Sequence, residues 1–173
     1  AEYYVNLSTN NFNRVTGLPG TDGFRTALVD NPELIRSLNV PDQMRAQFCY
    51  EDSPICVDDG TPLPSGEEWL APSAKPGMRA PHCWIGVNRS TLDLFGDGFV
   101  LLSLDADPDD VGRLVEAAAA RGIPFRVEDI SNPDAAARYQ RRLVLVRPDG
   151  HVAWRDDTAP ADTGSIIAKM CGA

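Results

Sequence analysis

Residues 99–130 read FVLLSLDADPDDVGRLVEAAAARGIPFRVEDI, a stretch that predicts a strand, a helix and a second strand. Its opening, Phe99–Leu104, is apolar enough for a strand buried on both faces. Asp107 and Pro108 predict the start of the helix, because an N-cap carboxylate followed by proline suits the first turn. Gly122 ends it. Apolar residues recur between them at helical spacing: Val111, Leu114, Val115 and Ala118.

The second strand, Phe125–Ile130, must run parallel to the first, because a helical crossover joins them. The remaining predicted elements are a short helix from Asn132 and Pro133 through Tyr139, a hairpin of Leu143–Val146 and His151–Trp154 around the turn Pro148-Asp149-Gly150, and a terminal helix capped by Asp162 or Thr163. This order predicts an α/β fold with a thioredoxin-like mixed sheet: strand–helix–strand, then an antiparallel hairpin and a C-terminal helix.

The chain before this unit is less regular, and we expect an irregular N-terminal extension. Residues 1–45 are rich in Asn and Gly, with a short predicted helix at Pro32–Leu38, and we interpret them as the tail of a preceding domain. Residues 46–76 combine an extended segment, 46–57, with a Pro- and Gly-rich linker expected to lie over the surface. We place the thioredoxin-like domain at 77–173, and within it Trp84–Val87 also predicts a strand.

Charge excludes two classes of partner. The 173 residues carry a formal charge of −9, whereas nucleic acids and anionic membranes require a basic face. No segment has the unbroken apolar length of a membrane span, and the start lacks the pattern of a signal peptide. We therefore expect a cytoplasmic protein. The chain does not begin with Met, which favours a fragment of a longer protein.

Four cysteines occur, at positions 49, 56, 83 and 171. Their irregular spacing fits neither a zinc site nor a dense disulfide framework. We expect buried, reduced thiols, with a Cys49–Cys56 disulfide across a hairpin as the alternative.

No catalytic residue is predicted. A working thioredoxin has its reactive cysteine at the start of the first crossover helix, where this chain has Asp107-Pro108-Asp109-Asp110. It also has a cis-proline before the hairpin, where this chain has Arg138–Arg142.

No metal or cofactor site is predicted either. The acidic run resembles the spacing of an EF-hand loop, but Asp110 takes the place of the required glycine, so we assign these acids to helix capping. The triplet Gly96-Asp97-Gly98 is similar to a flavin-contacting turn, yet no G-x-G-x-x-G precedes it.

The candidate functional residues are Arg79, His82 and Trp84, which we expect to form a domain interface. His82 and Cys83 are neighbours in an extended segment, so their side chains point to opposite faces and cannot form a nucleophilic pair. We interpret His82 as a buried hydrogen-bonding group at a domain junction, and His151 as a strand surface residue.

Two segments, Pro76–Leu102 and Val146–Arg155, resemble the last domain of class A flavoprotein monooxygenases, the family of phenol and dichlorophenol hydroxylases and polyketide aromatic hydroxylases. Pro76–Ile85, Ser90–Gly96 and Phe99–Leu102 are similar to its "PG-x-R-x-PH-x-W … STLDL-x-G … F-x-LL" pattern, and Val146–Arg155 to its "RPDGHVAWR" ending. The resemblance runs from about Gln47 to the end of the chain.

The resemblance implies a parent enzyme that uses FAD and NAD(P)H to insert one oxygen atom into a phenolic ring. It implies that flavin and substrate domains precede this one, and that this domain packs against them and, in some members, supports homodimerisation. Two other interpretations stay open: a stand-alone thioredoxin- or peroxiredoxin-like protein, and an acidic interaction module.

Overall fold

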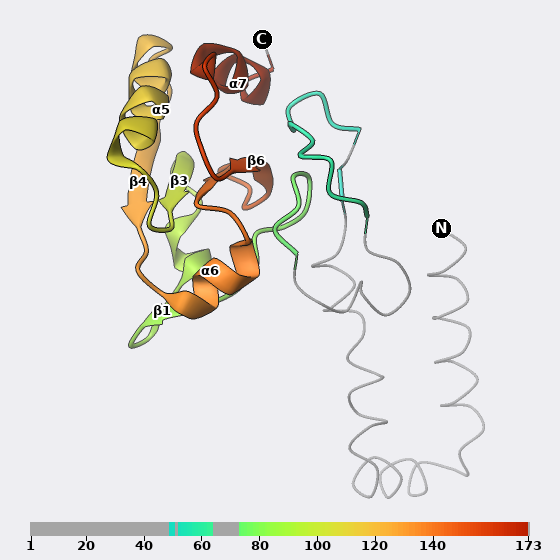
Figure 1. Cartoon of the computed structure of the whole chain (residues 1–173). Coiled ribbons are helices and arrows are strands. Elements are labelled where there is room, and N and C mark those ends of the chain that lie inside the picture. Colours follow the sequence, from blue (N-terminus) through green and yellow to red (C-terminus); the bar gives the residue numbers. More distant parts are fainter. Residues whose placement is uncertain (1–48, 51, 64–72, 173) are drawn as a thin grey trace, which may run out of the picture. The chain divides into compact units, whose positions relative to one another are not determined.

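The computed structural model describes residues 49–50, 52–63 and 73–172 (Figure 1). The chain divides into two units, and every described residue belongs to the unit Ala46–Ala173. The expectations for residues 1–45 and for residues 64–72 of the linker lie outside the described residues. The domain boundaries therefore stay predictions.

A four-stranded sheet in the order β4-β3-β5-β6 organises the described unit. β3 (Phe99–Ser103) and β4 (Phe125–Asp129) are parallel, with Leu101 opposite Val127. β5 (Leu143–Val146) runs antiparallel to β3, and β6 (Val152–Asp156) antiparallel to β5. This is the predicted thioredoxin-like mixed sheet, and the predicted fold class is confirmed.

Three α-helices pack on the sheet, as the sequence predicted (Figure 1). α5 (Pro108–Ala120) is the crossover between β3 and β4 and shares one apolar core with α7 (Thr163–Met170). α6 (Pro133–Tyr139) contributes to the second core, on the opposite face. Each helix begins with a side-chain cap: the capping residues are Asp107, Asn132 and Asp162, whose carboxylate or amide oxygens accept backbone N–H groups.

The strand predicted at Trp84–Val87 is present, and it lies outside the main sheet. β1 (Trp84–Gly86) pairs only with β2 (Arg89–Ser90) in a separate two-stranded hairpin, which leads into the 3-10 helix η2 (Thr91–Leu94). Val87, in the turn of this hairpin, is 95% exposed. Apolar composition predicted the strand, but composition alone could not show that it lies outside the main sheet.

Two upstream segments cover the outer edge of β6. Val57 donates its backbone N–H to the carbonyl of Ala153 at 2.8 Å. Gly77 donates to the carbonyl of Val152, also at 2.8 Å, and Val152 donates back to Met78. The linker was expected to lie over the surface, but 74–78 are buried. These residues close the sheet edge, which explains their burial.

The cysteine expectation holds in part. Cys56 and Cys83 are buried free thiols, whereas Cys171 is exposed, contrary to expectation, because it follows the last helix. The Cys49 thiol lies 3.7 Å from the carbonyl oxygen of Pro76. Among the described residues, no helix is both long and apolar enough to cross a membrane.

Candidate functional site

The three predicted interface residues are all exposed in the described unit. Trp84 is 60% exposed, and the ring of His82 contacts it edge-on, with the ring centroids 4.9 Å apart. His82 was expected to be a buried hydrogen-bonding group, and within this unit it is neither buried nor hydrogen-bonded to a described residue. Arg79 likewise makes no ion pair with the residues that the structure describes.

A buried polar network fixes the backbone that carries these side chains. The hydroxyls of Thr91 and Tyr139 both donate to the carbonyl of Pro81 at 2.8 Å. The backbone N–H of Cys83 donates to the Thr91 hydroxyl at 3.0 Å. Burial raises the pKa of Tyr139, so its hydroxyl remains a proton donor. Pro81 and Cys83 are thereby held inward, and the alternation of an extended chain turns His82 and Trp84 outward.

Neighbouring groups extend this surface. Asp93 interacts electrostatically with His82, and the hydrogen bond from the Ser90 N–H holds the pKa of Asp93 below its ordinary range. Leu92, which is 37% exposed, lines a shallow hollow together with Arg79. We call the exposed set Arg79, His82, Trp84, Val87 and Leu92 the docking face.

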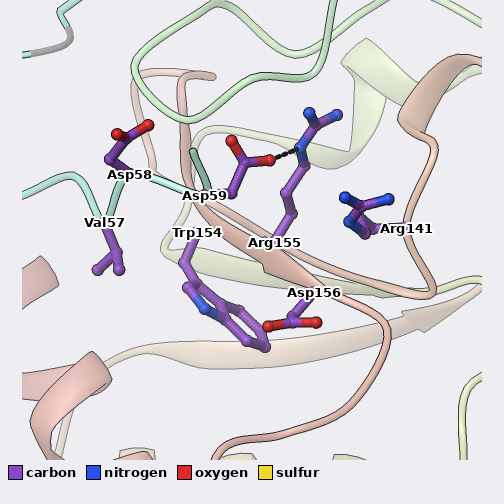
Figure 2. A pocket seen from close by; sticks show the side chains of 7 residues that line it. All are labelled: Val57, Asp58, Asp59, Arg141, Trp154, Arg155 and Asp156. Atoms are coloured by element: carbon purple, nitrogen blue, oxygen red, sulfur yellow. Dashed lines mark hydrogen bonds and ion pairs between the residues drawn. The ribbon is translucent and has the colours of Figure 1, made fainter. Parts of the chain in front are cut away.

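A second site is a charged hollow of about 300 Å³ beside β6 (Figure 2). Its lining residues are Val57, Asp58, Asp59, Arg141, Trp154, Arg155 and Asp156. Arg155 is only 2% exposed, and its Nε lies 2.6 Å from Oδ2 of Asp59. The same guanidinium donates to the Thr61 hydroxyl at 3.0 Å and to the Tyr139 carbonyl at 3.1 Å.

A second buried cation holds the same segment. Lys75 donates from Nζ to Asp58 at 2.8 Å and to the carbonyl of Thr61 at 2.5 Å. The hydrogen bond and the charge of Lys75 lower the pKa of Asp58. Burial alone would raise the pKa of Asp59, but hydrogen bonds from the Thr61 N–H and from Arg155 outweigh it, and the pKa is lowered. Arg155, which lines the hollow, and Lys75, which contacts its Asp58, are thus already paired with carboxylates.

The start of α5, where a working thioredoxin has its reactive cysteine, carries no sulfur. Asp107 accepts the N–H of Asp109 at 2.9 Å and caps the helix as predicted. Within 49–50, 52–63 and 73–172, no group of His, Cys, Asp and Glu side chains could hold a metal ion.

The turn Gly96-Asp97-Gly98 also differs from a pyrophosphate-binding loop. It leads into strand β3 and not into a helix, so it offers no row of helix N–H groups. A Cβ at Gly98 would lie 2.8 Å from the carbonyl oxygen of Pro124, so this glycine serves close strand packing.

Sequence reasoning predicted Arg79, His82 and Trp84 of the docking face but missed the residues that build the hollow. Asp59 and Lys75 lie in a segment interpreted as linker, and the partner of Asp59 is 96 residues away in the chain. Arg155 carried the only usable signal, a cation within the apolar strand VAWRD, since a buried charge requires a partner.

Three comparisons with known proteins bear on this geometry. The family model "aromatic-ring hydroxylase, C-terminal" matches residues 73–173. Aklavinone 12-hydroxylase RdmE of Streptomyces purpurascens is 35% identical over 144 residues, which cover 76% of this chain and 26% of RdmE.

Two solved structures are also similar. RebC-10x, in its native and K252c-bound form, superposes with a TM-score of 0.70 and 38% identity over 87% of this chain and 28% of its own. Aklavinone-11 hydroxylase, solved as a ternary complex with FAD and aklavinone, gives a TM-score of 0.61 and 30% identity over 76% of this chain and 27% of its own. The chain therefore spans between a quarter and a third of the length of these proteins.

Proposed function

Because the chain belongs to the family of C-terminal domains of aromatic-ring hydroxylases, we propose that it is the structural and assembly domain of an FAD- and NAD(P)H-dependent aromatic monooxygenase. In this proposal the preceding flavin and substrate domains of the parent enzyme bind FAD and the phenolic substrate. This domain contributes no catalytic, flavin or metal residue. Its role is to pack against those domains through the docking face.

The observation that carries the proposal is the exposure of Trp84 on a rigid support. A large aromatic side chain that is 60% exposed, next to a valine that is 95% exposed, is costly to leave in water. Aromatic and arginine side chains are also enriched at the energetic centres of protein interfaces. The buried network around Pro81 holds Trp84 and His82 in place before docking, which reduces the entropy lost on binding.

The rest of the parent chain is the occupant that we propose for this face. The relatives extend well beyond the segment that this chain matches, since it covers 26% of RdmE and 28% of RebC-10x. An interface between domains of one chain typically has mixed polarity. Arg79 and His82 supply hydrogen-bond donors beside the apolar Trp84, which fits such an interface.

The test compares two proteins, the present chain and the full-length parent enzyme. Trp84→Ala or His82→Ala should cost the parent roughly 1–3 kcal/mol of unfolding free energy, because each removes a buried contact and strands its partner. In the present chain the same substitutions should cost less than about 0.5 kcal/mol, because the side chains are exposed. Thermal and urea denaturation of both proteins would measure the difference.

The matched control is Val115→Ala on α5, which is also exposed (38%) but lies outside the docking face. Its cost should be the same in the two proteins. Equal costs for Trp84→Ala in parent and present chain would overturn the docking proposal.

A further inference from the structure

Helix α6 has only seven residues, and polar contacts at both of its ends join it to the backbone of the docking face (Figure 1). Helices this short are marginal alone, so α6 depends on its neighbours. Its N-cap, Asn132, donates from Nδ2 to the carbonyl of Trp84 at 3.2 Å. Its last residue, Tyr139, donates from its hydroxyl to the carbonyl of Pro81 at 2.8 Å. The position of α6 therefore helps to set the position of the segment that carries His82 and Trp84.

The carboxyl end of α6 is held by Arg155 of β6. A helix leaves its last carbonyl groups without partners inside the helix, and a cation is favourable there. Arg155 donates from Nη1 to the carbonyl of Tyr139 at 3.1 Å and to the side-chain oxygen of Gln140 at 3.4 Å. Gln140 has a φ of +62°, in the left-handed region, and ends the helix. Arg155 thus caps a helix that could not form without outside contacts.

Arg155 is held in turn by residues 57–61, which we call the covering segment. Its Nε donates to Asp59 at 2.6 Å, as Figure 2 shows, and its Nη2 donates to the Thr61 hydroxyl at 3.0 Å. A buried cation that loses its carboxylate must find another acceptor or move toward water. The contact between Arg155 and α6 therefore depends on the covering segment.

Side chains decide whether the covering segment stays in place. Among the described residues, one backbone hydrogen bond joins it to β6, from the N–H of Val57 to the carbonyl of Ala153. Its other attachments run through Asp59, through Thr61 and through Lys75. A segment with so few backbone contacts can open without unfolding of the whole sheet.

We propose that the covering segment controls the order of the docking face through Arg155 and α6. With the segment in place, Arg155 holds the end of α6, and α6 holds the carbonyls of Pro81 and Trp84. When the segment leaves β6, α6 and the docking face loosen together. Thr91 also donates to the Pro81 carbonyl, so the face loosens and does not unfold.

This coupling would make docking conditional on the upstream chain. A face that is ordered in only a fraction of the molecules binds with an affinity reduced by that fraction. Coupling between two sites is also reciprocal, so a docked face would favour the seated covering segment. The coupling itself lies within this chain, and only its use in assembling the parent enzyme rests on the proposed function.

The first test measures amide exchange by NMR in the complete 173-residue chain. The N–H of Gln140 donates within the last turn of α6, and the N–H of Cys83 donates to the Thr91 hydroxyl beneath the docking face. Asp59→Asn should accelerate exchange at both N–H groups at least about tenfold, because local opening depends on the contacts that close it.

The matched control is Arg113→Met on α5. Arg113 also pairs with a carboxylate, that of Asp110, and donates to two backbone carbonyls at 2.8 and 2.9 Å, but these belong to residues 159–160 and not to α6. Its loss should accelerate exchange at Gln140 and Cys83 less than about twofold, because distant sites without shared partners act independently.

A milder variant keeps the test usable if Asp59→Asn does not fold. Thr61→Val removes one acceptor of Arg155 and should accelerate exchange at Gln140 and Cys83 about threefold. A double-mutant cycle then tests the route through α6. In a Tyr139→Phe background, the effect of either substitution on Cys83 should shrink at least about threefold, because the hydroxyl link to Pro81 is gone.

Three results would overturn the coupling. The first is unchanged exchange at Cys83 in the variants of the covering segment. The second is equal acceleration by Arg113→Met, and the third is an effect on Cys83 that Tyr139→Phe leaves intact. All are measured in the present chain, so none bears on the docking-face proposal, which is tested in the parent enzyme with other residues.

Discussion

Asp59 and Arg155 are 96 residues apart in the chain, yet Oδ2 of one lies 2.6 Å from Nε of the other. Their side chains are 8% and 2% exposed, so this is a buried ion pair and not a surface contact. It joins a segment that composition assigns to a linker to the last strand of the sheet. The hydrogen bond from Arg155 to the carbonyl of Tyr139 extends the connection toward Pro81, because the Tyr139 hydroxyl donates there.

Breaking this pair should destabilise the domain strongly. Arg155→Met leaves the Asp59 carboxylate without its main partner, and loss of one member of a buried ion pair typically costs about 3–5 kcal/mol. Arg141→Met is the matched control, because Arg141 lines the same hollow but contacts Asp157 only at 4.0 Å in a largely exposed pair. It should cost below about 1 kcal/mol. Urea denaturation would measure both losses of unfolding free energy. Similar losses would show that the buried Asp59–Arg155 pair contributes no more to stability than the exposed Arg141–Asp157 pair.

The same pair predicts a dependence on acid. The pKa of Asp59 is lowered from its ordinary value of 3.8, so its ionised form is favoured in the folded protein. The resulting stability is present above pH 3.8 and declines as the pH falls through the lower, folded-state pKa. Asp59→Asn should therefore be less stable than the unsubstituted chain at neutral pH. The difference in unfolding free energy between the two should narrow below pH 3.8. A gap in unfolding free energy that stays constant down to pH 2 would contradict this expectation.

Removing each of the two hydroxyls in the network beneath the docking face should cost a different amount of unfolding free energy. Thr91→Val removes an acceptor as well as a donor and leaves the buried N–H of Cys83 without a partner, so it should cost about 2 kcal/mol. Tyr139→Phe should cost about 1 kcal/mol, because Pro81 still accepts from Thr91. Thermal denaturation would rank them. A larger loss for Tyr139→Phe would mean that the Cys83 N–H finds another partner.

Substitution of two glycines by alanine should change the unfolding free energy in opposite directions. A Cβ at Gly98 would lie 2.8 Å from the carbonyl oxygen of Pro124, so Gly98→Ala must displace backbone and should cost about 1–3 kcal/mol. A Cβ at Gly112, within α5, meets nothing within 4 Å. Gly112→Ala should therefore stabilise the domain by up to about 1 kcal/mol, because alanine favours the helix. Equilibrium unfolding of the two variants would settle both signs.

A flavin-binding assay tests the proposal that the preceding domains, and not this one, bind FAD. The chain has no G-x-G-x-x-G segment, and the turn at Asp97 leads into a strand. Incubation of the chain with excess FAD followed by desalting should give a colourless protein. Retention of one flavin per chain would show that this domain holds the cofactor itself.

Much of the fold could be predicted because its signals are local. The caps at Asp107 and Asn132, and the turn ending at Gly150, each depend on residues a few positions apart. Apolar runs then identified the buried strands β3 and β5.

The contacts that carry the two sites could not be predicted in the same way. Asp59 finds Arg155, and Tyr139 finds Pro81, only once the sheet has brought distant segments together. His82 is exposed within this unit, because alternation along the chain points its ring outward, away from the core that Cys83 enters, and its burial at a domain junction stays a prediction. Local patterns therefore indicated the elements and the exposed face, while the pairings across the fold required three dimensions.

The covered edge of β6 has a consequence for exchanging this domain between hydroxylases. A crossover at residue 73, where the family match begins, would combine a foreign upstream segment with this sheet. The transferred domain would lose Val57, which pairs with the edge of β6. It would keep Lys75 and Arg155, two buried cations whose partners Asp58 and Asp59 would be gone. Recombination breakpoints that preserve a working enzyme should fall before Cys49, so that the sheet and the segments that cover the edge of β6 come from the same protein.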